Sequence, residues 1–259
     1  MLTTPVFWKI RLKASSIHLA ISLTFAVLAA LQVFAVWYPY PYREISGGRE
    51  LFLLVVTVDV IMGPLMTLAV FNLNKPRKEL QRDLAVIGVL QLAALVYGLW
   101  TVAVARPVHL VFEIDRFRVV HAVDIPPELL GRAPEGLRQL PLAGPTLLSV
   151  REFKDSKESF EGTMAALQGA ALGARPDFWQ SYEKAKPQIL ARVRSLAELK
   201  TRFPARMGEI DSALKSAAAS ARPPTSIGYI PLVSRSTFWT VLIDTNTTEV
   251  IAFVPIDSF

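Results

Sequence analysis

The stretch LFLLVVTVDVIMGPLMTLAVFNL, Leu51–Leu73, decides the fold class of this chain. It is one of three apolar runs, and the other two are Ile17–Tyr38 and Leu84–Ala105. Each run has the length of about 20 residues that a helix needs to cross the hydrocarbon core of a bilayer. The sequence therefore predicts an integral membrane protein. Its membrane domain, residues 1–105, has three transmembrane helices at about 17–38, 51–73 and 84–105, and a soluble domain follows at 106–259.

Basic residues beside the runs indicate how the chain is oriented in the membrane. Lysine and arginine are concentrated before the first run and between the second and third runs (Lys9, Arg11, Lys13, Lys75, Arg77, Lys78, Arg82). Such an excess marks cytoplasmic segments. We therefore expect a cytoplasmic N-terminus and a C-terminal domain on the far side of the membrane, which is the periplasm if the source is a Gram-negative bacterium. An uncleaved first helix is favoured over a signal peptide, because its apolar run exceeds the roughly 7–15 residues usual for such a peptide.

The soluble domain has the pattern of an α+β fold. Val108–Val123 predicts a β-hairpin that turns at Asp115-Arg116, and further strands are expected at Thr146–Phe153, Ile227–Val233, Thr237–Asp244 and Glu249–Pro255. Lys157–Leu172 and Asp177–Ala221 have helical composition. Strands at both ends of a helical middle predict a small antiparallel sheet covered by helices.

Polar residues within the apolar runs are candidate functional residues. Asp59 lies about eight residues into the second run, roughly 12 Å below its outer end, and a carboxylate at that depth is costly unless it has a role. One interpretation is structural: Asp59 hydrogen-bonds inside the helix bundle, for example to Tyr97 at the same depth, while Gln91 bonds to a neighbouring helix. The other is that Asp59 binds a partner. His18 is expected near the cytoplasmic end of the first helix, far from Asp59.

Two proline-containing pairs mark the ends or bends of the predicted helices. Gly63-Pro64 follows Asp59 by about one turn, and proline removes a backbone donor there, so a kink is expected. The kink serves either packing among the three helices or a groove for a foreign helix. Arg106-Pro107 reads as a membrane-exit motif, with arginine at the interface and proline ending the third helix.

Other classes of function receive little support from the sequence. The net charge of +6 is diffuse rather than a basic stripe, so no nucleic-acid partner is expected. The chain has no cysteine, which excludes disulfides and thiolate metal sites. No catalytic motif is present, and His109 and His121 lie in strand-like runs as sheet residues. We therefore expect no enzyme, metal site or cofactor.

Several blocks of the sequence carry a family resemblance. They are Lys13-Ala-Ser-Ser-Ile-His-Leu19, Trp37-Tyr-Pro39, Asp59-Val-Ile-Met-Gly-Pro-Leu-Met-Thr-Leu68, Gln91-Leu-Ala-Ala-Leu-Val-Tyr-Gly98, Arg106-Pro-Val108 with Phe112, and Asp115-Arg-Phe117. In these blocks and their spacing the chain resembles the TfpX/TfpZ family of type IV pilin accessory proteins, over nearly its full length.

The resemblance implies a non-enzymatic role in type IV pilus biogenesis, in which the protein stabilises a cognate pilin or assists its assembly. The implied partners are the bilayer and the pilin, through both the pilin's transmembrane helix and its periplasmic head. The alternative is a membrane-anchored periplasmic sensor or scaffold of another envelope machine. A membrane enzyme would require polar groups converging in a pocket, for example around Asp59 or the pair His109 and His121.

Overall fold

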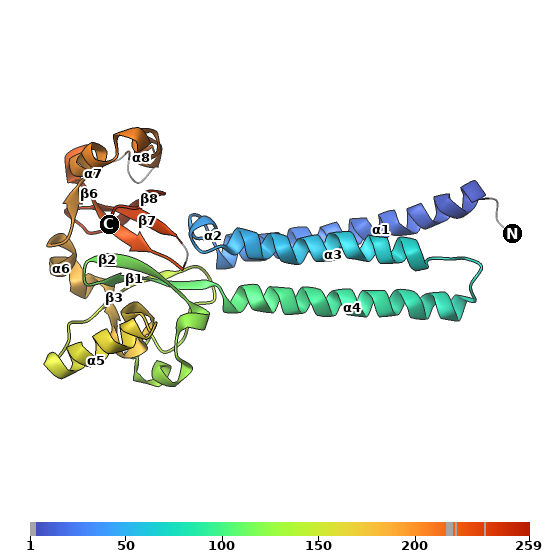
Figure 1. Cartoon of the computed structure of the whole chain (residues 1–259), viewed down its shortest axis with the longest axis horizontal. Helices are drawn as coiled ribbons and strands as arrows, with labels where there is room; N and C mark the ends of the chain where they lie inside the picture. The colour runs from blue at the N-terminus through green and yellow to red at the C-terminus, as the bar shows by residue number, and fades with distance from the viewer. Residues whose placement is uncertain (1–3, 216–219, 221, 236) are drawn as a thin grey trace. The chain divides into compact units, whose positions relative to one another are not determined.

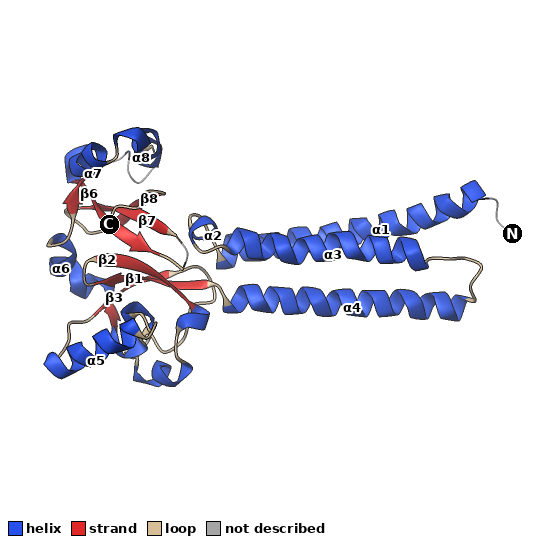
Figure 2. Cartoon of the chain, viewed as in Figure 1, coloured by secondary structure: helices blue, strands red, loops and turns tan. Residues whose placement is uncertain are grey.

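The computed structural model describes residues 4–215, 220, 222–235 and 237–259. They form two compact units that alternate along the chain. The membrane unit runs through Pro39 and resumes at Gly47–Val104, whereas the soluble unit consists of Tyr40–Ser46 and Ala105–Phe259. Figures 1 and 2 show the helices of the first unit and the sheet of the second. The segment between the first two apolar helices therefore belongs to the soluble unit, which the sequence analysis did not predict.

The described part of the membrane unit contains three helices long and apolar enough to cross a bilayer. They are α1 (Thr4–Leu31) continued by a π-helical turn, η1 (Gln32–Trp37), then α3 (Gly48–Val70) and α4 (Arg77–Val104). The predicted fold class is confirmed in this respect. However, α1 begins well before Ile17, since lysine, arginine and leucine are good helix formers and no glycine or proline interrupts Val6–Ile17.

Within the membrane unit, α3 packs against both α1 and α4, while α1 and α4 have only sparse contact with each other. Near the α3 N-terminus the packing is aromatic: the Phe34 and Phe52 ring centroids lie 4.8 Å apart. The Tyr38 hydroxyl there donates a 3.1 Å hydrogen bond to the Val102 carbonyl. A Cβ at Gly98 would lie only 2.6 Å from a methyl group of Val55, so α3 and α4 approach closely at that point.

The soluble unit is built on a sheet that has eight strands among the described residues, in the order β4-β3-β1-β2-β6-β7-β8 with β5 beside β6. The strands are β1 (Pro107–Glu113), β2 (Arg116–His121), β3 (Thr146–Val150), β4 (Trp179–Ser181), β5 (Arg194–Ser195), β6 (Ile227–Val233), β7 (Phe238–Asp244) and β8 (Val250–Val254). The α+β class is confirmed. The sheet is mixed rather than antiparallel, because β1 pairs parallel with β3 and β2 pairs parallel with β6.

The helices of the soluble unit are shorter than its sequence predicts. Among the described residues they are α2 (Tyr42–Ile45), α5 (Ser156–Leu167), α6 (Lys186–Leu190), α7 (Leu196–Arg202) and α8 (Met207–Leu214), with 3-10 turns between them. The stretch Asp177–Ala221, expected to be helical, also contributes β4 and β5, and its residues 216–219 and 221 lie outside the described residues. Sheet pairing overrides helical propensity in β4, where Trp179 is buried against the sheet.

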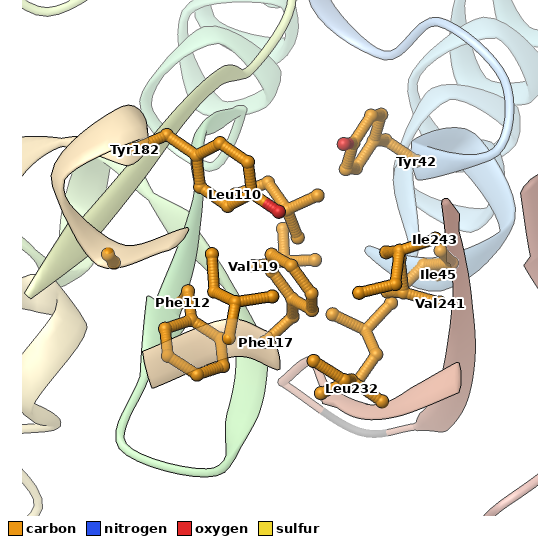
Figure 3. Close-up of a cluster of buried hydrophobic side chains, with 13 residues drawn as sticks. Tyr42, Ile45, Leu110, Phe112, Phe117, Val119, Tyr182, Leu232, Val241 and Ile243 are labelled. Atoms are coloured by element: carbon orange, nitrogen blue, oxygen red, sulfur yellow. The ribbon is translucent and has the colours of Figure 1, made fainter. Parts of the chain in front are cut away.

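Both faces of the sheet are covered, as expected for strands that are apolar on both sides. On one face, Leu110, Phe112, Leu232 and Ile243 belong to a cluster that also contains Tyr42 and Ile45 of α2. Figure 3 shows Ile45 beside Val241 and Ile243. The other face carries two clusters, one around Trp179 and Phe178 and one around Leu199 and Ile210 of α7 and α8.

Candidate functional site

A row of polar side chains on α1 binds α3 inside the membrane unit. Arg11 donates a hydrogen bond of 2.6 Å to the Phe71 carbonyl and another to the Ala69 carbonyl. One and two turns further along, Ser15 donates to the Pro64 carbonyl at 2.9 Å, and His18 Nδ1 lies 2.5 Å from Thr67 Oγ1. These bonds satisfy polar groups in a segment where water is scarce, and they fix α1 against α3.

The row follows directly from the helical repeat. Arg11, Ser15, His18 and Ser22 are separated by four, three and four residues, the spacing of one face of an α-helix. Ser22 is buried, as are Pro64 and Thr67, the partners of Ser15 and His18. This face was not predicted from the sequence, because the residues before Ile17 were interpreted as a basic flank of the first helix. The four-three-four spacing of polar residues was the available signal.

Asp59 and Gln91 make the corresponding connection between α3 and α4. Gln91 Nε2 donates to the Asp59 carbonyl oxygen at 2.9 Å and to the carboxylate Oδ1 at 3.2 Å. Asp59 is only 8% exposed. Gly63, one turn from Asp59, faces the Gln91 side chain so closely that any Cβ at residue 63 would overlap it. The glycine therefore makes room for the glutamine that holds the aspartate.

The predicted site residues are only partly brought together. The expected hydrogen bond between Asp59 and Tyr97 is wrong: Tyr97 is 67% exposed and lies beside Trp100, with ring centroids 5.8 Å apart. Pro64 lies inside α3, where its carbonyl accepts the bond from Ser15.

Arg106 and Pro107 lie just beyond α4, which ends at Val104. Arg106 donates to the Pro141 carbonyl at 3.2 Å, within the soluble unit. Pro107 is the first residue of β1. The pair therefore marks the point where helix gives way to strand.

A cavity of about 250 Å³ lies beside the polar contacts of the membrane unit. Its lining comes from α1, α3 and α4 (His18, Ile21, Ser22, Phe25, Asp59, Gly88, Gln91, Leu92, Leu95). His18 thus shares a cavity with Asp59, contrary to the expectation that the two are distant. The reason is the early start of α1, which places His18 fourteen residues inside the helix rather than at its end.

The soluble unit separates the two histidines that were candidates for an enzymatic site. His109 is 2% exposed, lies 2.7 Å from Thr146 Oγ1 through Nδ1, and contacts Trp179 edge-on. Burial lowers the pKa of His109 to about 4. His121 instead lies 3.1 Å from Asp124 and lines a separate cavity of about 230 Å³ with Ser234. The two imidazoles therefore form no joint site.

A cavity of about 720 Å³ in the soluble unit combines apolar walls with both signs of charge (Phe112, Ile114, Phe153, Arg151, Glu152, Arg192). Arg151 there forms paired 2.8 Å hydrogen bonds with Glu158. The bond from Arg151 and the Lys154 backbone amide lower the pKa of Glu158 to about 2. Among the described residues, no cluster of three or more histidines and carboxylates is placed to hold a metal ion.

The sequence is similar to one protein family and to several proteins of known description. The sequence model of the family described as "Fimbrial assembly protein FimB" matches residues 6–47, which include the polar face of α1. The chain is 38% identical over 249 residues to "Fimbrial assembly protein, serogroup I" of Dichelobacter nodosus, covering 95% of each chain. The serogroup E1 protein of the same organism is 36% identical with the same coverage.

A shorter relative from the same organism, "Fimbrial assembly protein, serogroups C1 and C2", is 43% identical over 123 residues. That alignment covers 48% of this chain and 92% of the relative. No solved structure matches the chain.

Proposed function

The chain belongs to the family of fimbrial assembly proteins, and from this membership we propose that it is an accessory protein for type IV pilus biogenesis. The observation that carries the proposal is similarity across 95% of both chains to proteins described as fimbrial assembly proteins. More specifically, we propose that the chain is a TfpX/TfpZ-type pilin accessory protein. It stabilises its cognate pilin or assists the assembly of that pilin, and it performs no catalysis.

The architecture suits this task. A pilin before assembly is a membrane helix with a globular head, so a helper with a membrane unit and a soluble unit offers a surface for each part. Gly63 and Pro64 serve packing within the chain, because Gln91 and Ser15 already occupy their surroundings.

The proposed location is the bacterial inner membrane, with the N-terminus in the cytoplasm and the soluble unit in the periplasm. The hydrogen bonds from Arg11 to the last turn of α3 support this orientation. They bring the N-terminal basic residues to the same end of the membrane unit as Lys75 and the loop that follows α3, so both basic clusters lie on one side, as cytoplasmic segments do.

Deletion of the gene tests the proposal, with total pilin and surface pili quantified and the gene restored in trans. We expect loss of pili that complementation reverses. Lower total pilin would identify a stabilising role, and normal pilin without pili an assembly role. Unchanged pilin and unchanged pili would reject the proposal in favour of a sensor or scaffold of another envelope machine.

A further inference from the structure

The membrane unit has an open groove on one side. Because α3 contacts both α1 and α4 while these two barely touch, α1 and α4 form the walls of a trough with α3 as its floor. The cavity of about 250 Å³ lies in this trough. Figure 1 shows the three helices running alongside one another.

The floor of the groove carries unused hydrogen-bonding capacity. Asp59 Oδ1 accepts from Gln91, but among the described residues the second carboxylate oxygen accepts no hydrogen bond. His18 lines the same groove and uses Nδ1 on Thr67. A carboxylate in the hydrocarbon region needs a donor or a positive charge, and lipid tails supply neither. Gln91 supplies one such donor and His18 shares the cavity, so what stays open among the described residues is the second carboxylate oxygen, which can accept a hydrogen bond from a group that enters the groove.

The walls suit the surface of another helix. Ile21 and Phe25 of α1 and Leu92 and Leu95 of α4 are apolar, like most helix surfaces in a bilayer. Gly88 of α4 also lines the groove, and a Cβ placed there would have no atom within 4 Å. A glycine facing open space on a helix is the feature that lets a second backbone approach closely.

We propose that the groove between α1 and α4 binds the transmembrane helix of a pilin, and that an amine or other N–H group of that helix pairs with Asp59. The proposal rests on the proposed function and adds the place and the chemistry of contact. A helix is favoured because it supplies both requirements at once: an apolar surface for the walls and one polar group at the depth of the carboxylate. The pilin helix thus completes a bundle that this chain leaves one helix short.

Cysteine crosslinking tests the proposal directly, because the chain has no cysteine of its own. Gly88→Cys and Ile21→Cys place thiols in the groove, whereas Leu90→Cys and Leu23→Cys place them two residues away along the same helices, at exposed positions of α4 and α1. The probe is the pilin with single cysteines at successive positions of its membrane helix, oxidised in native membranes. We expect the groove positions to crosslink about tenfold more than the controls, which corresponds to ~1.4 kcal/mol. The pilin positions that crosslink should recur with the period of an α-helix.

Two blocking variants separate binding from folding. Asp59→Leu should reduce the Ile21→Cys crosslink about tenfold, because it leaves the N–H group of the bound helix without an acceptor in the hydrocarbon region. Gly88→Leu should do the same by filling the groove, and it disturbs no neighbour within 4 Å, so normal abundance is expected. A wild-type crosslink in Gly88→Leu, equal crosslinks from the control positions, or crosslinks only between two copies of this chain would overturn the proposal.

Deletion and crosslinking together tell the two proposals apart. If deletion abolishes pili but the groove positions fail to crosslink, the accessory function stands and the groove assignment is wrong. If deletion leaves pilin and pili unchanged, the accessory function itself fails, and the groove assignment falls with it.

Discussion

The two units of this protein are held together in opposite ways. In the membrane unit, large apolar side chains such as Leu54 and Val89 face outward. Apart from one apolar cluster around Phe52, the specific contacts between its helices come from polar bonds and close glycine approaches. In the soluble unit the apolar side chains are inside, in three clusters against a sheet. Since lipid is as apolar as leucine, apolar burial distinguishes native contacts only in the soluble unit.

The comparison shows where mutational sensitivity should lie. Removing apolar volume should be costly in the soluble unit, whereas adding volume or removing one polar bond should matter in the membrane unit. A four-part series of substitutions, ordered by expected effect, measures this contrast. Thiol protection in denaturant gives the readout for each unit, with Ala252→Cys as a buried reporter in the soluble unit and Ala26→Cys in the membrane unit.

The largest effect is expected from Ile45→Ala. Ile45 is 0% exposed in the cluster on the sheet, although it lies in the segment between two membrane helices. Loss of a buried isoleucine should lower the free energy of unfolding of the soluble unit by about 2–5 kcal/mol. Leu142→Ala, at a position 78% exposed, is the matched control and should change it by less than about 0.5 kcal/mol. Equal protection of Ala252→Cys in both variants would show that Tyr40–Ser46 is not part of this unit.

The second prediction concerns acid. His109 has a pKa near 4 in the fold against 6.5 in the unfolded chain. As pH falls, His109 therefore binds a proton at a higher pH in the unfolded chain than in the folded one. The stability that depends on it is intact above pH 6.5 and is lost progressively as pH falls through 4. At 1.36 kcal/mol per pKa unit the full loss is about 3 kcal/mol. His109→Gln keeps a group near Thr146 but does not titrate, so its unfolding free energy should be flat by comparison. A wild-type slope retained in His109→Gln would contradict this assignment.

The helices and most strands of the two units were predictable from the sequence, whereas the contacts between distant segments were not. Hydrophobic run length alone identifies the membrane helices. A composition rich in Val, Phe and Ile identifies β1 and β2, and alternation identifies β6, β7 and β8, because all three signals are local. The parallel pairings of β1 with β3 and β2 with β6 depend on distant segments and leave no local trace. The same holds for Ile45, whose partners are near residues 110 and 240.

In the candidate site, residue depth counted from the ends of apolar runs gave the wrong partners. It paired Asp59 with Tyr97, whereas the rotation of α4 presents Gln91 to Asp59. It also separated His18 from Asp59, because a charged flank such as Lys9–Lys13 was assumed to end the helix. Depth is a one-dimensional measure, and contact between helices also depends on which face each residue occupies.

The third prediction adds volume in the membrane unit. Gly63→Leu forces a side chain onto Gln91 and should destabilise the packing of α3 on α4 by about 1–3 kcal/mol, the usual cost of overpacking. Gly88→Leu is the same substitution at a glycine without neighbours within 4 Å, and it should be close to neutral in the isolated protein. Protection of Ala26→Cys reports the difference. Similar losses for both glycines would mean that helix propensity, not the contact with Gln91, sets the effect.

The smallest effect is expected where the sequence first suggested function, at Asp59 itself. A double-mutant cycle of Asp59→Ala and Gln91→Ala should give a coupling energy of about 0.6 kcal/mol, because interhelical hydrogen bonds in membranes are weak on average. The Asp59 carbonyl, which survives truncation of its side chain, keeps part of the bond to Gln91. A coupling above about 2 kcal/mol would make the aspartate chiefly a structural residue of this bundle. A weak coupling, together with a large loss of the groove crosslink in Asp59→Leu, would instead assign the carboxylate to the partner helix.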